Sequence, residues 1–239
     1  MIVKDISFLT PQENILFDDV LLHLAEGGQG EEVLRFWESK ELFIVLGRIS
    51  RAEEDLFVEH IVEDDIPVLR RSSGGGTVLQ GKGCLNYSLI LSKDSHPAIN
   101  DLRRSYQFIL GKIISALKNT GIETVFLPIS DIALVDNQKK ISGNAQKRGK
   151  KFILHHGTVL YNFDLVKIER YLKLPKSVPE YRRGRSHKEF VTNVSAEGIK
   201  IKENIRRIFN AGHKNCPMSP EEQECLKRFL KTRNVMVDF

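Results

Sequence analysis

The sequence lacks the features that mark secreted, membrane-spanning or metal-binding proteins. Its three cysteines, Cys84, Cys216 and Cys225, form no CxxC pair, so neither a disulfide framework nor a zinc quartet is predicted. No apolar run approaches the roughly 20 residues that a membrane-spanning helix needs. The first residues, MIVKDISFLTPQEN, also lack the long apolar core of a signal peptide. We therefore expect a cytoplasmic protein without membrane contacts.

The common nucleotide-binding signatures are missing as well. The sequence contains no GxGxxG, so nothing in it supports a Rossmann site. Residues 76–83 read GxxxxGK and then place Gly83 where a P-loop requires a Ser or Thr hydroxyl for Mg²⁺. The following residues, CLNYSLIL, have the composition of a strand, whereas a P-loop leads into a helix. The sequence therefore excludes both of these ways of holding a nucleotide.

What is present is the composition of a folded domain with an excess of positive charge. Hydrophobic residues make up 41% and charged residues 28% of the 239 residues, which is typical of a globular protein with a full core. The net charge of +5 indicates an anionic partner, either nucleic acid or an acidic protein. The basic residues are concentrated at 139–151 and 182–188, without interleaved aromatic residues that could stack on bases. This favours an acidic protein over nucleic acid, and a solvated basic face is the plainer alternative.

The most unusual stretch is RRSSGGGTVLQ, residues 70–80. Three consecutive glycines let backbone N–H groups approach a ligand closely, and such groups beside a guanidinium suit phosphate or carboxylate oxygens. A tight turn or a bulge is the alternative interpretation. In a second stretch, residues 139–160, Lys140 lies between predicted strands and is followed by small polar residues that leave room for a ligand. We interpret the two stretches as opposite walls of one site.

Two adjacent histidines, His155 and His156, raise the question of acid–base or metal chemistry. Adjacent residues of a strand point to opposite faces, so the pair does not suit one metal ion. We predict that one histidine is hydrogen-bonded in the core and the other lines the site, with no metal held by protein ligands. Cys84 is a possible nucleophile, but a buried free cysteine usually packs rather than reacts. The GxSxG signature of serine hydrolases is absent.

The hydrophobic pattern predicts an α+β fold with a mixed, mostly antiparallel sheet flanked by helices, because most predicted strands follow one another along the chain. Thr10-Pro11-Gln12-Glu13 has the form of a capping box at the start of the first helix. The predicted helices are 11–25, 52–63, 98–118, 164–172, 201–209 and 220–231, and the predicted strands are 34–38, 42–47, 66–71, 85–91, 124–127, 132–135 and 152–161. Residues 174–190, interrupted by two prolines, are predicted to form a loop.

Four motifs, RRSSGGGTV, GCLNYS, KISGNAQ and LHHGTVL, together resemble the catalytic domain of the lipoate–protein ligase A family. This wider group also includes octanoyl and lipoyl transferases and biotin–protein ligases. The resemblance extends to PQENILFDD, LRFWE and VLGR near the start and to PEYRRGRSHKEFVTN near the end, so that it covers about residues 8 to 195. It implies a fold related to class II aminoacyl-tRNA synthetases.

The resemblance also implies a two-step reaction. Lipoate or octanoate and ATP, with Mg²⁺, would give an acyl-adenylate such as lipoyl-AMP, and the acyl group would pass to one lysine of an acceptor. The acceptors would be lipoyl domains of 2-oxoacid dehydrogenases or the glycine-cleavage H protein. Lys140 would be the catalytic residue, binding the acyl carbonyl and the phosphate. The residues placed around the nucleotide and the acyl group are Arg71, Ser73, Gly74, Gly75, Gly76, Thr77, Val78, Leu79, Asn86, Ser88, Lys140, Ser142, Gly143, Asn144, Ala145, His156, Gly157 and Thr158.

Two departures from the family pattern leave alternatives open. Gln80 stands where many ligases carry a histidine. We assign residues 1–198 to the catalytic domain and 199–239 to a short helical tail packed on it, whereas larger ligases continue into an accessory domain. The protein would then need a separate accessory protein for adenylation, or would act only as an octanoyl or lipoyl transferase between carrier proteins. The transferases carry a cysteine ahead of the lysine, and the corresponding stretch here, LPISDIALVD, contains none. A biotin ligase is disfavoured because its usual GRGR-type loop is missing.

Overall fold

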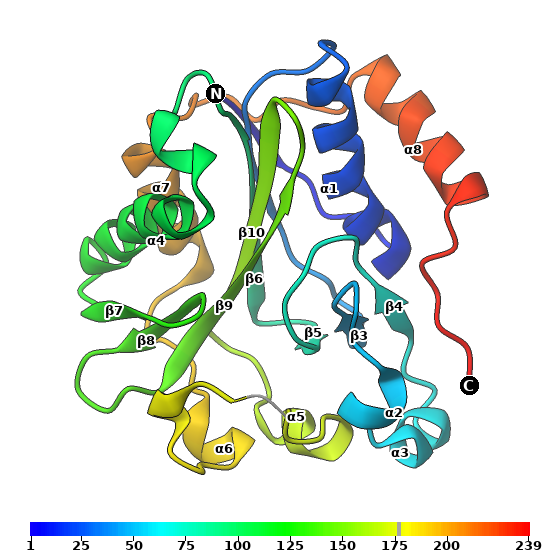
Figure 1. Cartoon of the computed structure of the whole chain (residues 1–239), viewed down its shortest axis with the longest axis vertical. Coiled ribbons are helices and arrows are strands. Elements are labelled where there is room, and N and C mark those ends of the chain that lie inside the picture. The colour runs from blue at the N-terminus through cyan, green and yellow to red at the C-terminus, as the bar shows by residue number, and fades with distance from the viewer. Residues whose placement is uncertain (176–177) are drawn as a thin grey trace.

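The computed structural model describes residues 1–175 and 178–239 as two sheets surrounded by helices (Figure 1). A seven-stranded sheet has the strand order β1-β2-β6-β10-β9-β8-β7, and a three-stranded sheet has the order β4-β3-β5. The strands are β1 (Ile2–Asp5), β2 (Val33–Trp37), β3 (Phe43–Leu46), β4 (Val68–Arg70), β5 (Val78–Gln80), β6 (Cys84–Ser92), β7 (Thr124–Leu127), β8 (Asp131–Leu134), β9 (Lys140–Arg148) and β10 (Phe152–Leu160). Among the strands of the described residues most neighbours are antiparallel, whereas the β1–β2 and β3–β4 pairs are parallel.

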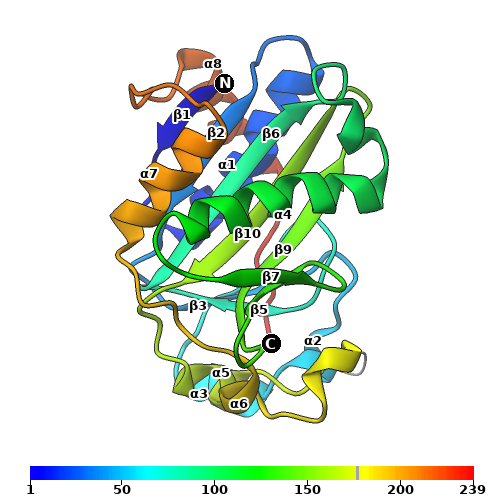
Figure 2. The same ribbon diagram turned by 90° about the vertical axis from the view of Figure 1, so that its left-hand side faces the viewer.

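Helices cover both faces of the large sheet, and Figure 2 shows α4 crossing one of them. The helices are α1 (Pro11–Glu26), α2 (Ala52–Asp55), α3 (Val58–Glu63), η1 (Pro97–Asn100), α4 (Leu102–Lys118), α5 (Val166–Tyr171), η2 (Glu180–Arg182), α6 (His187–Phe190), α7 (Gly198–Ile208) and α8 (Pro220–Thr232). Residues of α4 and α7 pack on one face of the sheet, and residues of α1 and α8 pack on the other. The predicted α+β class with a mostly antiparallel sheet is therefore confirmed.

The first long helix forms where the sequence predicts it and for the predicted reason. Thr10 and Glu13 make a reciprocal capping box, and Pro11 occupies the first helical turn. Backbone N–H groups at a helix start have no acceptor within the helix, so these side chains supply the missing hydrogen-bond acceptors. The helix runs to Glu26 and buries one long face against the sheet, including Phe17 and Val20.

Several element boundaries differ from the prediction. Residues 52–63 form two short helices, α2 and α3, separated at Leu56 and Phe57. The predicted helix at 98–118 begins instead as the 3₁₀ helix η1 and becomes α-helical at Leu102. Two short strands, β1 and β5, were not predicted. The predicted loop at 174–190 contains η2 and α6, and its residues 176–177 lie outside the described part of the chain.

The largest correction concerns residues 140–148, which the sequence places in a polar segment between strands. They form β9, a nine-residue strand between β10 and β8. Its sequence, KISGNAQKR, has little of the β-branched and aromatic character that marks strands. Pairing on both sides overrides this low propensity. Lys140 therefore lies at the start of a central strand rather than in a loop.

The segment after residue 198 is divided between the two faces of the sheet. Helix α7 packs with α4, and α8 packs with α1. In Figure 1 the chain then descends from α8 past β4 to the C-terminus. Within the described ranges, no helix has both the length and the apolar character needed to span a membrane.

Candidate active site

The glycine loop, residues 71–77, connects β4 to β5 and is shaped by the buried side chain of Arg71. The Arg71 guanidinium donates to the carbonyl oxygens of Gly74 and Gly76, both at 2.7 Å, and its Nε donates to Ser73 Oγ at 3.1 Å. Burial lowers the pKa of Arg71 to about 10. Most of its hydrogen bonds are directed at the loop's own atoms, and its Nη1 donates to the Val45 carbonyl oxygen of β3 at 3.3 Å, so Arg71 shapes the loop and ties it to β3. A direct contact with a nucleotide stays a prediction for this residue.

The glycine loop lies directly on strand β9. A Cβ atom added to Gly75 would stand 3.5 Å from the Cβ of Ala145 and 2.9 Å from Arg71 Nη2. Gly75 also has a φ of +85°, which side chains disfavour. On its other side, a Cβ at Gly47 would come within 1.9 Å of the Gly75 carbonyl oxygen. Two glycines thus allow the loop to fit between β3 and β9.

Lys140 reaches over the same strip of β9. Its Nζ lies 3.1 Å from the position that a Cβ on Gly143 would occupy, and it forms an ion pair with Asp131 Oδ1 at 2.7 Å. Alternate residues of a strand share a face, so Gly143 and Ala145 are neighbours about 7 Å apart. Gly75 lies against Ala145 and the Lys140 ammonium lies over Gly143. The two stretches that the sequence assigns to opposite walls do meet.

The sheet beneath them presents polar and small side chains in two rows across β6, β10 and β9. Strand register aligns Asn86 with Thr158 and Gly143, and the next row aligns Ser88, His156 and Ala145. The opposite face of β6 carries Leu85, Tyr87, Leu89 and Leu91, which belong to the buried core. These two rows form the floor of the candidate site.

Gln80 closes one end of this floor. Its Nε2 donates to Thr158 Oγ1 at 2.9 Å, and its Oε1 accepts from Asn86 Nδ2 at 3.0 Å. Thr158 Oγ1 in turn donates to Asn86 Oδ1 at 2.6 Å, which completes a ring of three side chains. The residue that departs from the family pattern is therefore joined to two of the predicted site residues.

Ser73 connects the glycine loop to the floor through His156. Ser73 Oγ lies 2.7 Å from His156 Nε2; because this oxygen already accepts from Arg71, its proton is assigned to the bond with His156. His156 Nδ1 lies 3.9 Å from Asp18, too far for a hydrogen bond. Asp18 instead accepts from Arg35 at 2.7 Å and from Ser88 at 2.6 Å. The three groups resemble a nucleophile–base–acid series, but the link to the acid is not made.

Asp18 and Asp19 are the main site-region residues that sequence analysis missed. Burial raises the pKa of Asp18, while Arg35 opposes this effect. Asp19 accepts from Ser72 of the glycine loop and from Lys147 of β9. Adjacent acids within an otherwise apolar helix face, LFDDVLL, are a signal of buried charge that needs partners. That signal was available in the sequence.

Three of the predicted residues face away from the floor. The Asn144 side chain donates to the Ser130 carbonyl oxygen at 2.9 Å and to Ser142 Oγ at 3.2 Å, on the α4 side of the sheet. Tyr87 also donates to Asn144 on this side. A Cβ on Gly157 would stand 2.0 Å from Asn144 Oδ1. Ser142, Asn144 and Gly157 can therefore line the site only through their backbone.

The loop's last predicted residues, Thr77, Val78 and Leu79, lead into the small sheet. Thr77 Oγ1 donates to Asp55 Oδ2 at 2.5 Å, which ties the end of the loop to α2. Val78 and Leu79 pair with Val45 and Ile44 of β3. Residues 77–79 thus continue the wall of the candidate site that begins at the glycines.

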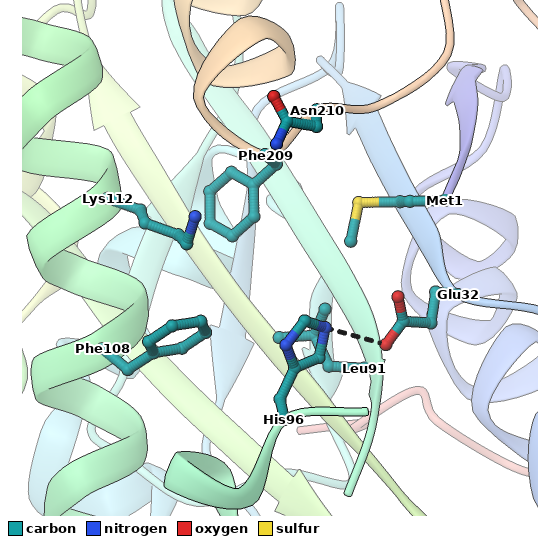
Figure 3. Close-up of a pocket in the computed structure, with 8 residues that line it drawn as sticks. All are labelled: Met1, Glu32, Leu91, His96, Phe108, Lys112, Phe209 and Asn210. Atoms are coloured by element: carbon teal, nitrogen blue, oxygen red, sulfur yellow. Dashed lines mark ion pairs between the residues drawn. The ribbon is translucent and has the colours of Figure 1, made fainter. Parts of the chain in front are cut away.

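A cavity of about 300 Å³ lies elsewhere, between α4, the end of α7 and the first residue (Figure 3). Lys112 stands between the rings of Phe108 and Phe209, and a ring nitrogen of His96 lies 3.0 Å from the Glu32 carboxylate. None of the residues predicted to form the site lines this cavity. Among the described residues, no group of three or more His, Cys, Asp or Glu is arranged to hold a metal ion.

Comparison with known proteins shows the family to which the chain belongs. The model of the lipoyl protein ligase A/B catalytic domain matches residues 10–211. The chain is 29% identical over 191 residues to the probable lipoate-protein ligase A of Mycoplasma pneumoniae, covering 78% of this chain and 54% of that protein. It is also 27% identical over 232 residues to the octanoyltransferase LipM of Staphylococcus epidermidis, covering 85% of this chain and 82% of that protein. The chain thus spans about half of the first relative and most of the second.

Solved structures share the fold. The bipartite lipoate protein ligase of Thermoplasma acidophilum, described with its E2 lipoyl domain, has a TM-score of 0.83 at 20% identity over 97% of this chain and 92% of its own. A lipoate-protein ligase A bound with ATP has a TM-score of 0.83 at 19% identity over 97% and 94% of the two chains. Since the family model spans most of the sequence, the chain belongs to the enzymes of the lipoyl protein ligase A/B catalytic domain family.

Proposed function

We propose that the protein is a cytoplasmic lipoate–protein ligase, which activates lipoate or octanoate with ATP and transfers the acyl group to a lysine of an acceptor protein. The observation that carries this proposal is the meeting of the Lys140 ammonium and the glycine loop on one strip of β9. An acyl-adenylate contains a carbonyl and a phosphate close together. A single cation and a glycine-rich backbone are suited to hold both groups.

The residue types fit each step of that reaction. In the first step a carboxylate oxygen of the acid attacks the α-phosphorus of ATP, and pyrophosphate leaves. Lys140 would offset the negative charge that both reactants bring together, and Mg²⁺ would enter with the phosphates of ATP. In the second step the acceptor's lysine amine attacks the acyl carbonyl, and AMP leaves. The enzyme positions the reactants and needs no nucleophile of its own.

The acyl chain would lie on the apolar part of the site. Trp37 is in register with Asn86 at the end of the floor and packs with Phe43 and Val45. Burial of each CH₂ group of the chain contributes about 0.8 kcal/mol. The Trp37 Nε1 is buried and has no hydrogen-bond partner among the described residues, so this wall offers a donor as well as apolar surface.

Transfer from an acyl carrier through a cysteine thioester is the second candidate, since a LipM octanoyltransferase is among the similar proteins. The positions of the cysteines argue against it. Cys84 is fully buried in the core beneath the small sheet, and burial raises the pKa of its thiol. Cys225 is buried between α8 and α1, and the Cys216 N–H donates to the Val3 carbonyl on the β1 edge. A buried thiol with a raised pKa is a poor nucleophile, so the setting of Cys84 favours adenylation.

We propose lipoyl domains, or the glycine-cleavage H protein, as acceptors. The T. acidophilum relative was solved as part of a lipoylation system with an E2 lipoyl domain. In this chain, exposed basic residues such as Arg183 and Lys188 follow Tyr181, whose hydroxyl bonds to Asp131 beside Lys140. Positive charge there would speed association with an acidic domain. A separate accessory protein would assist adenylation if the chain alone is insufficient.

The deciding experiment incubates the purified chain with an apo lipoyl domain and either lipoate, ATP and Mg²⁺ or an octanoyl-carrier protein without ATP. Mass spectrometry of the acceptor detects the acyl group that either reaction attaches. We expect ATP-dependent modification of a single lysine and no transfer from the carrier. Transfer from the carrier without ATP-dependent modification would refute the ligase and establish the transferase.

A further inference from the structure

The residues after α8 lie antiparallel to β4 at the edge of the small sheet and form a β-bridge with it. The Val237 N–H donates to the Val68 carbonyl oxygen at 2.9 Å, and the Arg70 N–H donates to the Val235 carbonyl oxygen at 2.7 Å. Leu69 and Met236 form the antiparallel bridge between these bonds. We call residues 233–237 the C-terminal strap; in Figure 1 they run beside β4. Strand β4 ends at Arg70, so the strap holds the backbone immediately before the glycine loop.

Apolar contacts keep the strap in place. Val235 and Met236 pack against a buried cluster that includes Trp37 and Leu69. Val237 packs against the second cluster beneath the small sheet. The two residues beyond the strap, Asp238 and Phe239, are exposed.

A buried carboxylate joins the strap to both walls of the candidate site. The Arg233 guanidinium lies 3.4 Å from the centre of the Phe229 ring, and its Nη1 lies 3.5 Å from Asp19 Oδ2. The other oxygen of Asp19 accepts from Ser72 Oγ of the glycine loop and, at 2.8 Å, from Lys147 Nζ of β9. One residue of α1 thus connects the strap, the loop and the strand beneath it.

We infer that the C-terminal strap is a positioning element for the glycine loop, acting through the β4 backbone and through Asp19. Three consecutive glycines lose more conformational freedom on ordering than other residues. A loop that is held before the ligand arrives avoids this cost during binding. The inference rests on the proposed function, because it assigns the benefit to nucleotide binding. The strap itself touches no substrate.

Three variants separate this role from general stability. Val237→Pro removes the N–H that donates to Val68, whereas Val237→Ala keeps it and serves as the matched control. Arg233→Gln removes the charge that faces Asp19 and leaves the strap's backbone bonds. The measurements are hydrogen exchange of the amides of residues 70–77, the KM for ATP, and kcat on an apo lipoyl domain.

For Val237→Pro and Arg233→Gln we expect amide exchange in residues 70–77 to accelerate about tenfold. The KM for ATP should rise about tenfold while kcat stays within about twofold. Val237→Ala should behave like the parent. Unchanged exchange in residues 70–77 in both variants, even with a lower melting temperature, would overturn the inference. If the parent chain shows no ligase activity, the proposed function fails, and the exchange measurement alone decides the role of the strap.

Discussion

The two faces of the central sheet differ most clearly at two neighbouring histidines. His155 points to the α4 side, where its Nε2 lies 3.3 Å from Asn144 Oδ1 and its Nδ1 lies 3.1 Å from Gln146 Nε2. His156 points to the other side, where it contacts Ser73 of the glycine loop. Burial lowers the pKa of each ring to about 3. One imidazole ring is thus part of the hydrogen-bonded core on the α4 face, and its neighbour supports the candidate site on the opposite face.

This difference shows which residues of the family motifs face the candidate site and which lie on the other face of the sheet. The motifs SGNA and HHGT are continuous in sequence, but alternate residues of a strand belong to opposite faces. Gly143, Ala145, His156 and Thr158 lie on the floor of the candidate site, whereas Ser142, Asn144 and His155 support the sheet from behind. Half of each motif is therefore structural, and variants on the two faces should fail in different ways.

The largest effect is expected for Lys140→Ala on the site face. Loss of the ammonium should lower kcat by about 100- to 1,000-fold, which is the range for removing one group that stabilises developing charge. The fold should persist, because the Lys140 side chain is partly exposed and Asp131 keeps the hydrogen bond that the Tyr181 hydroxyl donates to it. Steady-state kinetics and thermal unfolding measure the two properties. The neighbouring Lys139→Ala is the control, and equal turnover in the two variants would contradict the role of Lys140.

Gly157→Ala probes the opposite face and should mainly reduce stability. The new methyl group would stand 2.0 Å from Asn144 Oδ1 and 2.6 Å from the Tyr87 hydroxyl oxygen. Overpacking of this kind costs about 3 kcal/mol in the free energy of unfolding. Gly74→Ala is the control, since nothing lies within 4 Å of its added Cβ. Urea unfolding that shows equal stability for both variants would disprove the assignment of faces.

The same substitution at each of the two histidines compares the two faces directly. His155→Gln should lower the free energy of unfolding by about 1–3 kcal/mol, because it disturbs fully buried hydrogen bonds. His156→Gln should instead raise the KM for the acyl substrate or ATP, because it releases Ser73 and the glycine loop. Parallel unfolding and kinetic measurements test both statements. A larger loss of stability for His156→Gln than for His155→Gln would reverse the comparison.

The lowered pKa values of these histidines predict a pH dependence of stability. Below the ordinary pKa of about 6.5, the unfolded chain binds protons that the folded chain, with pKa values of about 3, does not bind. Their contribution is therefore complete above about pH 6.5 and falls as the pH is lowered toward 3, by at most about 1.4 kcal/mol per pH unit for each ring. Unfolding at pH 7 and pH 5 measures this slope. The double variant His155→Gln/His156→Gln should show a smaller slope, and an unchanged slope would contradict the assignment.

The smallest effect is expected for Cys84→Ala. Its thiol lies in the core beneath the small sheet and takes no part in the proposed reaction. Activity should stay within about twofold of the parent, with a modest loss of stability from the small cavity. Complete loss of activity, together with an acyl-thioester trapped on the parent protein, would restore the transferase hypothesis.

The sequence predicts most of the fold because its long elements carry strong signals. The capping box at Thr10, the apolar stripe of α1 and the strand-like composition of β6 and β10 are local features. Strand β9 was missed because its residues are small, polar or charged where they face the site or its supporting network. Its pairing with β8 and β10 is a tertiary effect that propensity does not report.

For the site, the sequence indicates which stretches meet but not how they are held. Lys140 and the glycine loop were predicted as partners, and the structure brings them together. Asp131, Tyr181 and Arg233 were not predicted, since their partners lie far away in sequence. Hydrogen bonds between distant segments follow from the fold, and single-residue spacing does not reveal them.

The most direct test of the central claim is a structure of the protein with a stable lipoyl-adenylate analogue. We predict that the analogue's phosphate and acyl carbonyl lie between the backbone of residues 74–79 and Lys140 Nζ, with Lys140 turned from Asp131 toward the ligand. An analogue bound elsewhere, with the 2.7 Å pair of Lys140 and Asp131 retained, would contradict the account.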